Sequence, residues 1–184
     1  MIDKFLDKEY LKYGNNKQRK SHEILNDYKV FNTLEKYNPI LAGTIPIDID
    51  INKSDLDIVC EVNDFVKFME ILENNFSKYE NFKIRYMEEE CIAVCNFEIE
   101  NIEIEIYASK IKSYRSNAYR HMLIEYRILN LLGLDFKNKI IQLKRSGLKT
   151  EQAFAELLNI KGNPYDKLLE LEAYSDEEIL ILYK

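Results

Sequence analysis

The chain has 184 residues, of which 46% are hydrophobic and 32% are charged, as is usual for a globular protein. The formal net charge of −6 argues against general binding of long nucleic acid, which requires a basic surface that neutralises phosphates. Only five glycines and three prolines leave little sequence for disordered linkers. We therefore expect an ordered chain that is too short for two large domains.

The cysteines and the apolar segments bear on location. Cys60, Cys91 and Cys95 are an odd set without the spacing of a metal site, so we expect reduced thiols. The first residues lack the basic region and apolar run of a signal peptide, and no apolar stretch is long enough to cross a membrane. The sequence predicts a cytoplasmic protein without membrane contact and leaves the oligomeric state open.

In chain order, apolar periodicity first predicts two helices, over residues 3–13 and 16–37. Period-two patterns then predict five strands, with one helix between the second and the third. The strands are expected at residues 40–42, 55–61, 82–87, 91–97 and 101–108, and the helix at 65–75. Short links between the last strands imply antiparallel pairing.

After Lys110 the pattern becomes helical throughout. Helices are expected at residues 117–132, 135–145, 150–158, 164–171 and 176–183. The predicted fold class is α+β, with a mixed sheet and flanking helices followed by a helical C-terminal half. We expect residues 1–110 to form the α/β core and residues 111–184 to pack on it, with a ligand between the two parts.

Two neighbouring carboxylates stand out in the strand predicted at residues 55–61. Asp55 and Asp57 share one face of it because alternate side chains of a strand point the same way. Like charges this close favour a divalent cation as their partner. The Gly43-Thr44 turn upstream adds backbone amides that can approach a phosphate. An Asp-X-Asp pair alone is a weak signal, and a solvated strand face is the alternative.

Together these features resemble the signature of the polymerase-β-like nucleotidyltransferase superfamily, with Thr44 where serine is commoner. The resemblance extends over nearly the whole chain to the bacterial DUF4269 family, a domain of unknown function. The segments that carry it are Tyr10–Asn15, Pro39–Pro46, Ser54–Ile58, Ala118–Met122, Gly147–Glu151 and Gly162–Tyr165.

The resemblance to the superfamily implies a third carboxylate on the strand predicted at residues 101–108. Glu103 and Glu105 lie on the polar face of that strand, and Glu105 is preferred because it lies further along the strand. Asp55, Asp57 and Glu105 are then the catalytic residues and the ligands of Mg²⁺ or Mn²⁺. Three residues before Asp55 are expected to contact the nucleotide: Gly43, Thr44 and Ser54.

Further nucleotide contacts are expected from the helical half, at Arg120, His121 and Lys149. Arg120 suits a phosphate, and a surface ion pair is the alternative. His121 lies one helical turn before Glu125, so we expect a hydrogen bond between them, in a catalytic or a purely structural role. Lys149 stands beside a predicted helix start, where free amides favour a phosphate; plain capping by Thr150 is the alternative.

The sequence thus predicts a metal-dependent nucleotidyltransferase that moves a nucleoside monophosphate from a triphosphate to an unknown acceptor. Long nucleic acid is the least favoured acceptor because of the acidic charge. A catalytically inactive nucleotide-binding or regulatory protein with the same fold is the first alternative, and a plain interaction module is the second. The sequence indicates no base preference.

Overall fold

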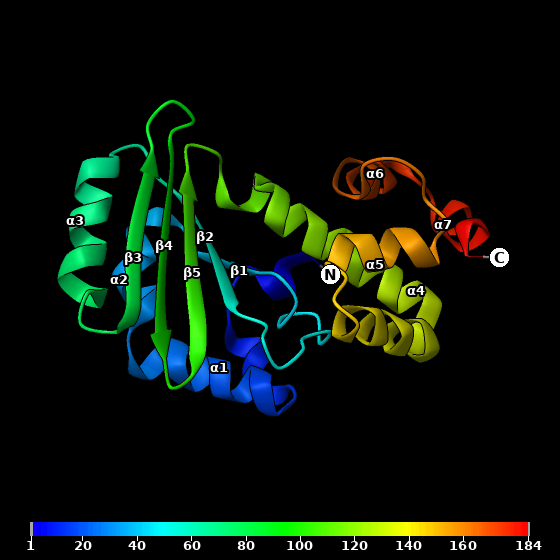
Figure 1. The fold of residues 1–184 in the computed structure, drawn as a ribbon, viewed down its shortest axis with the longest axis horizontal. Coiled ribbons are helices and arrows are strands. Elements are labelled where there is room, and N and C mark those ends of the chain that lie inside the picture. Colours follow the sequence, from blue (N-terminus) through cyan, green and yellow to red (C-terminus); the bar gives the residue numbers. More distant parts are fainter. Residues whose placement is uncertain (1, 184) are drawn as a thin grey trace. The chain divides into compact units, whose positions relative to one another are not determined.

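The computed structural model describes residues 2–183 (Figure 1). It divides into two compact units. The first unit holds the residues up to Asp48 together with Ser54–Tyr119, and the second holds Ile49–Lys53 together with the residues from Arg120 onward. The predicted packing of residues 111–184 on residues 1–110, with a ligand between them, stays a prediction.

A five-stranded mixed sheet forms the centre of the first unit and confirms the predicted fold class. Its strands are β1 (Ile40–Ala42), β2 (Leu56–Glu61), β3 (Glu80–Met87), β4 (Ile92–Ile99) and β5 (Ile102–Ser109). They lie in the order β1-β2-β5-β4-β3, as Figure 1 shows. β2 and β5 run parallel, whereas the other neighbouring pairs are antiparallel.

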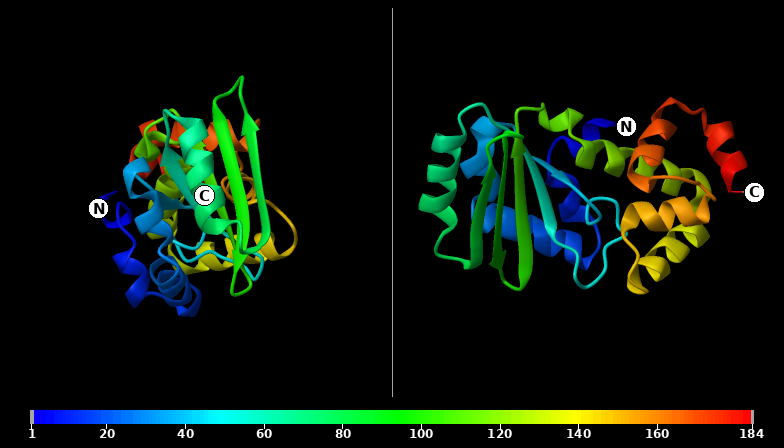
Figure 2. Two further views of the ribbon diagram at one scale, coloured as in Figure 1. Left: turned by 90° about the vertical axis from the view of Figure 1, so that its left-hand side faces the viewer. Right: turned by 45° about the horizontal axis from the view of Figure 1, so that its top comes forward.

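Three helices of this unit lie on one face of the sheet (Figure 2). They are α1 (Asn16–Asp27), α2 (Val30–Leu34) and α3 (Phe65–Phe76). Their apolar residues form one buried cluster with alternate residues of the strands, including Ile58 and Ile106. Burial of this apolar surface is the main stabilising contribution, and it fixes which face of each strand points inward.

The first predicted helices differ from the structure in two places. Residues 3–13 form two 3₁₀ turns, Ile2–Phe5 and Glu9–Tyr13, instead of one helix. The helix predicted to extend to Tyr37 ends at Asp27, because Lys29 adopts a left-handed backbone with φ 55° that no α-helix accommodates.

Helices make up the second unit, as predicted. They are α4 (Asn117–Arg145), whose first residues belong to the first unit, α5 (Thr150–Leu157), α6 (Pro164–Glu170) and α7 (Asp176–Leu182). Gly133, with φ 76° and ψ −166°, interrupts α4, which explains why the sequence pattern predicted two helices there. Arg127 joins α4 to the first residue of α7 and to the segment before it, through bonds to Asp176 Oδ1 (2.8 Å) and the Tyr174 carbonyl (2.7 Å).

The cysteines are free thiols in the structure. Cys60 and Cys95 are buried, and burial raises the pKa of both, that of Cys95 to about 12. A buried thiol with a raised pKa is a poor nucleophile and a poor metal ligand. Among the described helices, none has the length and apolarity that a membrane crossing demands.

Candidate functional site

Asp57 and Glu105 are Cα partners in the parallel pairing of β2 with β5. Residues in register on neighbouring strands point to the same face, so the two carboxylates lie side by side. This face is opposite the helices, because Leu56 and Ile58 on one strand and Ile104 on the other are fully buried in the core. Asp57 and Glu105 themselves are half-buried.

The close approach of residue 43 to Asp57 requires a glycine. Ala42, the residue before it, pairs with Asp57 across β1 and β2. A Cβ at Gly43 would overlap Oδ2 of Asp57, and the φ of Gly43 is +78°, a value that side chains other than glycine disfavour. Glycine thus lets the backbone pass directly beside the carboxylate.

Helix α1 holds the turn between Gly43 and Asp55. Thr44 Oγ1 donates to Ser54 Oγ at 3.2 Å, and Lys17 Nζ donates to the Ser54 carbonyl at 2.8 Å. The buried Gln18 amide donates to the carbonyls of Ile45 (2.9 Å) and Pro46 (3.2 Å). The sequence does not reveal these roles of Lys17 and Gln18, because their partners are backbone atoms far along the chain.

Asn96 on β4 fixes the orientation of Glu105. It is the register partner of Glu105, and its side-chain amide donates to Glu105 Oε2 at 3.1 Å and to Glu103 Oε1 at 3.4 Å. Glu103 is exposed, whereas Glu105 is half-buried and next to Asp57. The structure therefore places Glu105, rather than Glu103, beside the second aspartate of the motif.

Two hollows adjoin on this face, and Glu105 lines both. One, of about 310 Å³, also borders Asp57 and Tyr107. The other, of about 510 Å³, borders Lys83 and Arg85, which are exposed residues of β3. Neither cation has an ion-pair partner among the described residues. In the sequence, the alternation Lys83-Ile84-Arg85 indicates that both cations share one face of the strand, and strand pairing makes it the face of the carboxylates.

The carboxylate oxygens on this face suit a hard divalent cation, because they are the ligands that Mg²⁺ prefers. Asp55 precedes the first paired residue of β2, so the strand ladder does not fix its side chain. Within residues 2–183, the carboxylates of Asp55, Asp57 and Glu105 do not form a group whose ligand atoms all lie within 4.8 Å of one another. The sheet thus positions Asp57 and Glu105, whereas Asp55 lies just outside the paired residues of β2.

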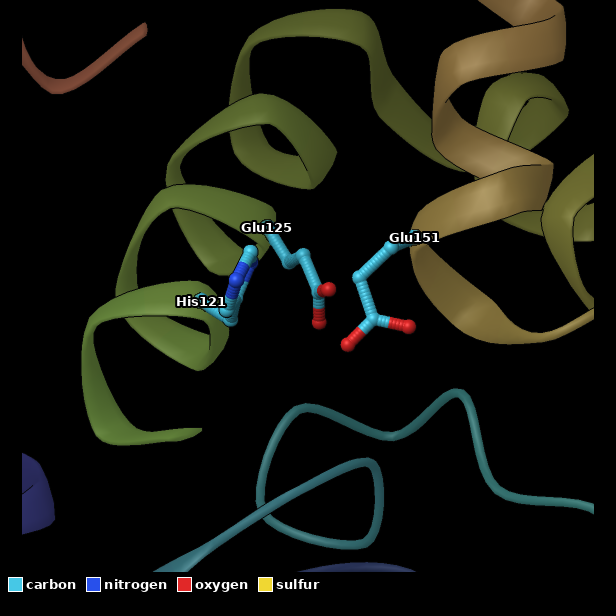
Figure 3. Close-up of side chains that lie close together, drawn as sticks. All are labelled: His121, Glu125 and Glu151. Atoms are coloured by element: carbon cyan, nitrogen blue, oxygen red, sulfur yellow. The ribbon is translucent and has the colours of Figure 1, made fainter. Parts of the chain in front are cut away.

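The compact trio is a different one, formed by His121, Glu125 and Glu151 in the second unit (Figure 3). His121 and Glu125 are buried on α4, and Glu151 lies half-buried in the first turn of α5. Burial lowers the pKa of His121; burial and the Glu151 charge hold the pKa of Glu125 well above its usual range, against the opposing charge of Lys144.

The predicted hydrogen bond between His121 and Glu125 is wrong. Among residues 2–183, the buried atoms His121 Nδ1 and Glu125 Oε1 have no hydrogen-bond partner. Helical spacing does bring the two residues to one face of α4, but Glu125 directs its carboxylate toward Glu151 (Figure 3). Sequence spacing within α4 gave no signal for Glu151, since a separate helix supplies it.

Arg120 and Lys149, the other two residues predicted to contact the nucleotide from the helical half, lie outside this trio. Arg120 forms a two-pronged ion pair with Glu172, with Nε–Oε1 at 3.0 Å and Nη2–Oε2 at 2.7 Å, and this pair raises its pKa. Lys149 is exposed, and its backbone N–H donates to Gln152 Oε1 at 3.0 Å. Lys149, not Thr150, is the residue that precedes the helix, so the predicted cap is displaced by one position.

Comparison of the sequence with protein families gives a match over residues 23–171 to the domain of unknown function DUF4269. The chain belongs to the DUF4269 family. No curated protein matches the sequence significantly.

Solved structures similar to this DUF4269 protein show its fold. The Cid1 poly(U) polymerase with Mg and 3′-dATP bound has a TM-score of 0.57 and 11% identity, covering 84% of this chain and 48% of that one. GLD-2 in its complex with RNP-8 has a TM-score of 0.53 and 13% identity, covering 100% and 82%. The chain thus spans about half the length of the Cid1 polymerase. The fold is that of the polymerase-β-like nucleotidyltransferases.

The close approach of Gly43 to Asp57 yields a testable prediction. Gly43→Ala should destabilise the protein by more than the about 1–3 kcal/mol that positive-φ strain alone costs, because the added Cβ meets the carboxylate. In an Asp57→Ala background the overlap with the carboxyl group is gone, and only the strain and a 3.3 Å contact with the Cβ of residue 57 remain, so the cost of Gly43→Ala should fall. Urea denaturation of the four proteins in this cycle measures the coupling.

Gly147→Ala is the matched control, because Gly147 also has a positive φ, of 108°, but has open space where a Cβ would lie. Its cost should be the same in the native chain and in the Asp57→Ala background. Equal costs of Gly43→Ala in the two backgrounds would show that Gly43 and Asp57 do not constrain each other.

Proposed function

We propose that this DUF4269 protein is a divalent-metal-dependent nucleotidyltransferase that transfers a nucleoside monophosphate from a nucleoside triphosphate to an acceptor hydroxyl. The observation that carries the proposal is the register pairing of Asp57 with Glu105 beside the Gly43-Thr44 turn. The nucleotidyltransferase fold supports it.

Asp57 and Glu105, joined by Asp55, are the residues that would hold Mg²⁺ or Mn²⁺. Such an ion, when bound, neutralises charge on the transferring phosphoryl group. The two carboxylates are presented from rigid, paired strands, and Asn96 holds one of them in place, so little side-chain freedom remains to be lost on binding.

The phosphates of the donor have several partners on this face. Gly43 has no side chain that would keep a phosphate from its backbone, and the hydroxyls of Thr44 and Ser54, already bonded to each other, offer donors to phosphate oxygens. Lys83 and Arg85 place two positive charges on the hollow that Glu105 also lines, where they offset the charge of a triphosphate.

In the transfer step, the acceptor oxygen forms a bond to the α-phosphorus. The bond from that phosphorus to the oxygen that bridges the α- and β-phosphates breaks, and pyrophosphate leaves. The hydroxyl proton passes to Glu105, which stands next to Asp57 and is oriented by Asn96, and from there to water. Asn96 thus acts as a positioning residue for the proton acceptor.

The acceptor and the base preference are open within this proposal. The similar structures include a poly(U) polymerase and an RNA terminal U-transferase. The net charge of −6 favours a small molecule or a short chain end over long nucleic acid. Nucleotide contacts by Arg120, His121 and Lys149 also stay predictions, as does a cytoplasmic location.

A catalytically inactive nucleotide-binding protein is the second candidate. It is favoured by the wider spacing of the carboxylates of Asp55, Asp57 and Glu105, which do not form a compact trio within the described residues. Such a protein would bind a triphosphate with Mg²⁺, as shown by a raised thermal midpoint, but would release no pyrophosphate.

Asp57→Asn tests the proposed activity. With a panel of triphosphates, Mg²⁺ or Mn²⁺ and candidate acceptors, the native protein should release pyrophosphate, and Asp57→Asn should reduce the rate by roughly 10²-fold or more because a metal-binding charge is lost. Thermal stability should be kept or raised, since removal of one carboxylate charge relieves repulsion with Glu105. Glu89→Gln, which removes a charge from the exposed β3–β4 turn, is the charge-matched control. Full turnover by Asp57→Asn would end the proposal.

Glu105 and Glu103 form a matched pair for locating the third carboxylate. Both accept a hydrogen bond from Asn96, but only Glu105 is the register partner of Asp57. Glu105→Gln should therefore lower turnover on the order of 10²–10⁴-fold, the usual contribution of a general base, whereas Glu103→Gln should leave turnover within about twofold. The reverse order of effects in a pyrophosphate-release assay would assign the role to Glu103.

A further inference from the structure

Three side chains in the helical unit form a cluster whose role the sheet face does not explain. His121 and Glu125 lie one turn apart on α4, and Glu151 reaches them from the first turn of α5 (Figure 3). One ligand atom from each of them lies within 4.8 Å of the other two. All three residues belong to the same compact unit, so the arrangement is a property of that unit alone.

The cluster contains polar atoms without partners. His121 is 8% exposed and Glu125 is 3% exposed, yet neither His121 Nδ1 nor Glu125 Oε1 has a hydrogen-bond partner in the part of the chain that the structure describes. A buried donor or acceptor that is left unsatisfied costs free energy. Because Glu125 points its carboxylate toward Glu151, two acceptors of like charge also face each other (Figure 3).

We propose that His121, Glu125 and Glu151 bind a divalent transition-metal ion, with Zn²⁺ as the best fit. One imidazole nitrogen and two carboxylate oxygens are the ligand types that zinc accepts, and imidazole favours a transition metal over Mg²⁺ or Ca²⁺. The ion would satisfy atoms that have no partner and would neutralise the repulsion between the two carboxylates. Three protein ligands leave a coordination position for water.

The geometry needs only a small adjustment. Zinc bonds of about 2.0–2.1 Å in a tetrahedral site set the ligand atoms roughly 3.3–3.4 Å apart, somewhat closer than the 4.8 Å limit within which they lie. His121 and Glu125 are buried on α4, whereas Glu151 is half-buried at a helix start. A change of side-chain torsion in Glu151 therefore closes the site without moving α4.

The charges around the cluster affect how strongly it would bind a cation. Lys144 is buried, its Nζ donates to the Ile49 carbonyl at 2.7 Å, and its charge acts on Glu125. Two carboxylates outweigh this single cation. The charges of Glu151, Arg120, Glu172 and Asp166 act on His121. Burial and the Glu151 charge raise the pKa of Glu125, so protons compete with the ion for this carboxylate and metal binding should release protons.

The ion would join the N-terminal half of α4 to the first turn of α5. It would thereby stabilise the helical unit, because an ion that binds only the folded state raises the thermal midpoint. This site differs in ligand type from the Asp57–Glu105 face, which offers oxygen ligands only. The inference does not rest on the proposed nucleotidyl transfer.

The test uses the full chain, freed of metal by a chelator, and Zn²⁺ alone as the probe. Isothermal titration should show one Zn²⁺ per chain with proton release, and Zn²⁺ should raise the thermal midpoint. Co²⁺ in its place should give the visible absorption of a bound tetrahedral ion. Glu151→Gln should lower Zn²⁺ affinity at least tenfold and abolish the rise in the midpoint.

Glu156→Gln is the control, since Glu156 is exposed on the same helix and should leave Zn²⁺ binding unchanged. Asp57→Asn should also leave it unchanged. Absence of Zn²⁺ binding by the native chain, or equal affinity in Glu151→Gln, would overturn the inference. Loss of Zn²⁺ binding in Asp57→Asn alone would also overturn it, by assigning the ion to the sheet face. The native-chain titration needs no variant, so it decides even where Glu151→Gln fails to fold.

Discussion

The parallel pairing of β2 with β5 is the constraint on which the candidate active site depends. In this pairing Asp57 is opposite Glu105, and the residues on either side of each are apolar and buried in the core under the helices. A slip of one residue in either strand would turn a carboxylate into the core and an isoleucine or leucine out of it. Burial of the apolar face therefore sets the register of the two carboxylates, and no polar contact between them is needed to do so.

The remaining parts of the site are arranged around that pair. β1 joins the other edge of β2, which brings Gly43 against Asp57, and β4 joins the other edge of β5, which brings Asn96 to Glu105. Helix α1 then fixes the connection between β1 and β2 through Lys17 and Gln18. A site built on paired strands and a bonded turn is largely preorganised, which is the condition for efficient electrostatic stabilisation of a transition state.

Much of this arrangement follows from local sequence. The alternation of isoleucine with acidic residues in β5 predicted both the strand and its polar face, and the Gly-Thr turn before an Asp-X-Asp strand predicted the edge at which the residues meet. The helix break at Lys29 had no such signal, because the residue adopts its left-handed backbone without glycine or asparagine. The kink at Gly133 did have one, and the pattern correctly separated two helical segments there.

What the sequence could not supply are the partners from distant segments. Asn96, Lys83 and Arg85 reach the carboxylate face only through strand pairing, and Glu151 reaches His121 only through the packing of α5 against α4. Spacing along one helix predicted that His121 and Glu125 share a face, but not that one buried polar atom of each would lack a hydrogen-bond partner among the described residues. Such contacts depend on tertiary structure, which periodicity within one element does not report.

The central claim is that Asp57 and Glu105 together hold the divalent ion of a bound nucleoside triphosphate. The most direct measurement is anomalous diffraction from crystals of the full chain soaked with Mn²⁺ and a non-hydrolysable triphosphate. The account predicts a manganese peak bonded to carboxylate oxygens of Asp57 and Glu105 and to phosphate oxygens of the ligand. A bound triphosphate whose manganese lies elsewhere, with no peak at Asp57 and Glu105, would contradict it.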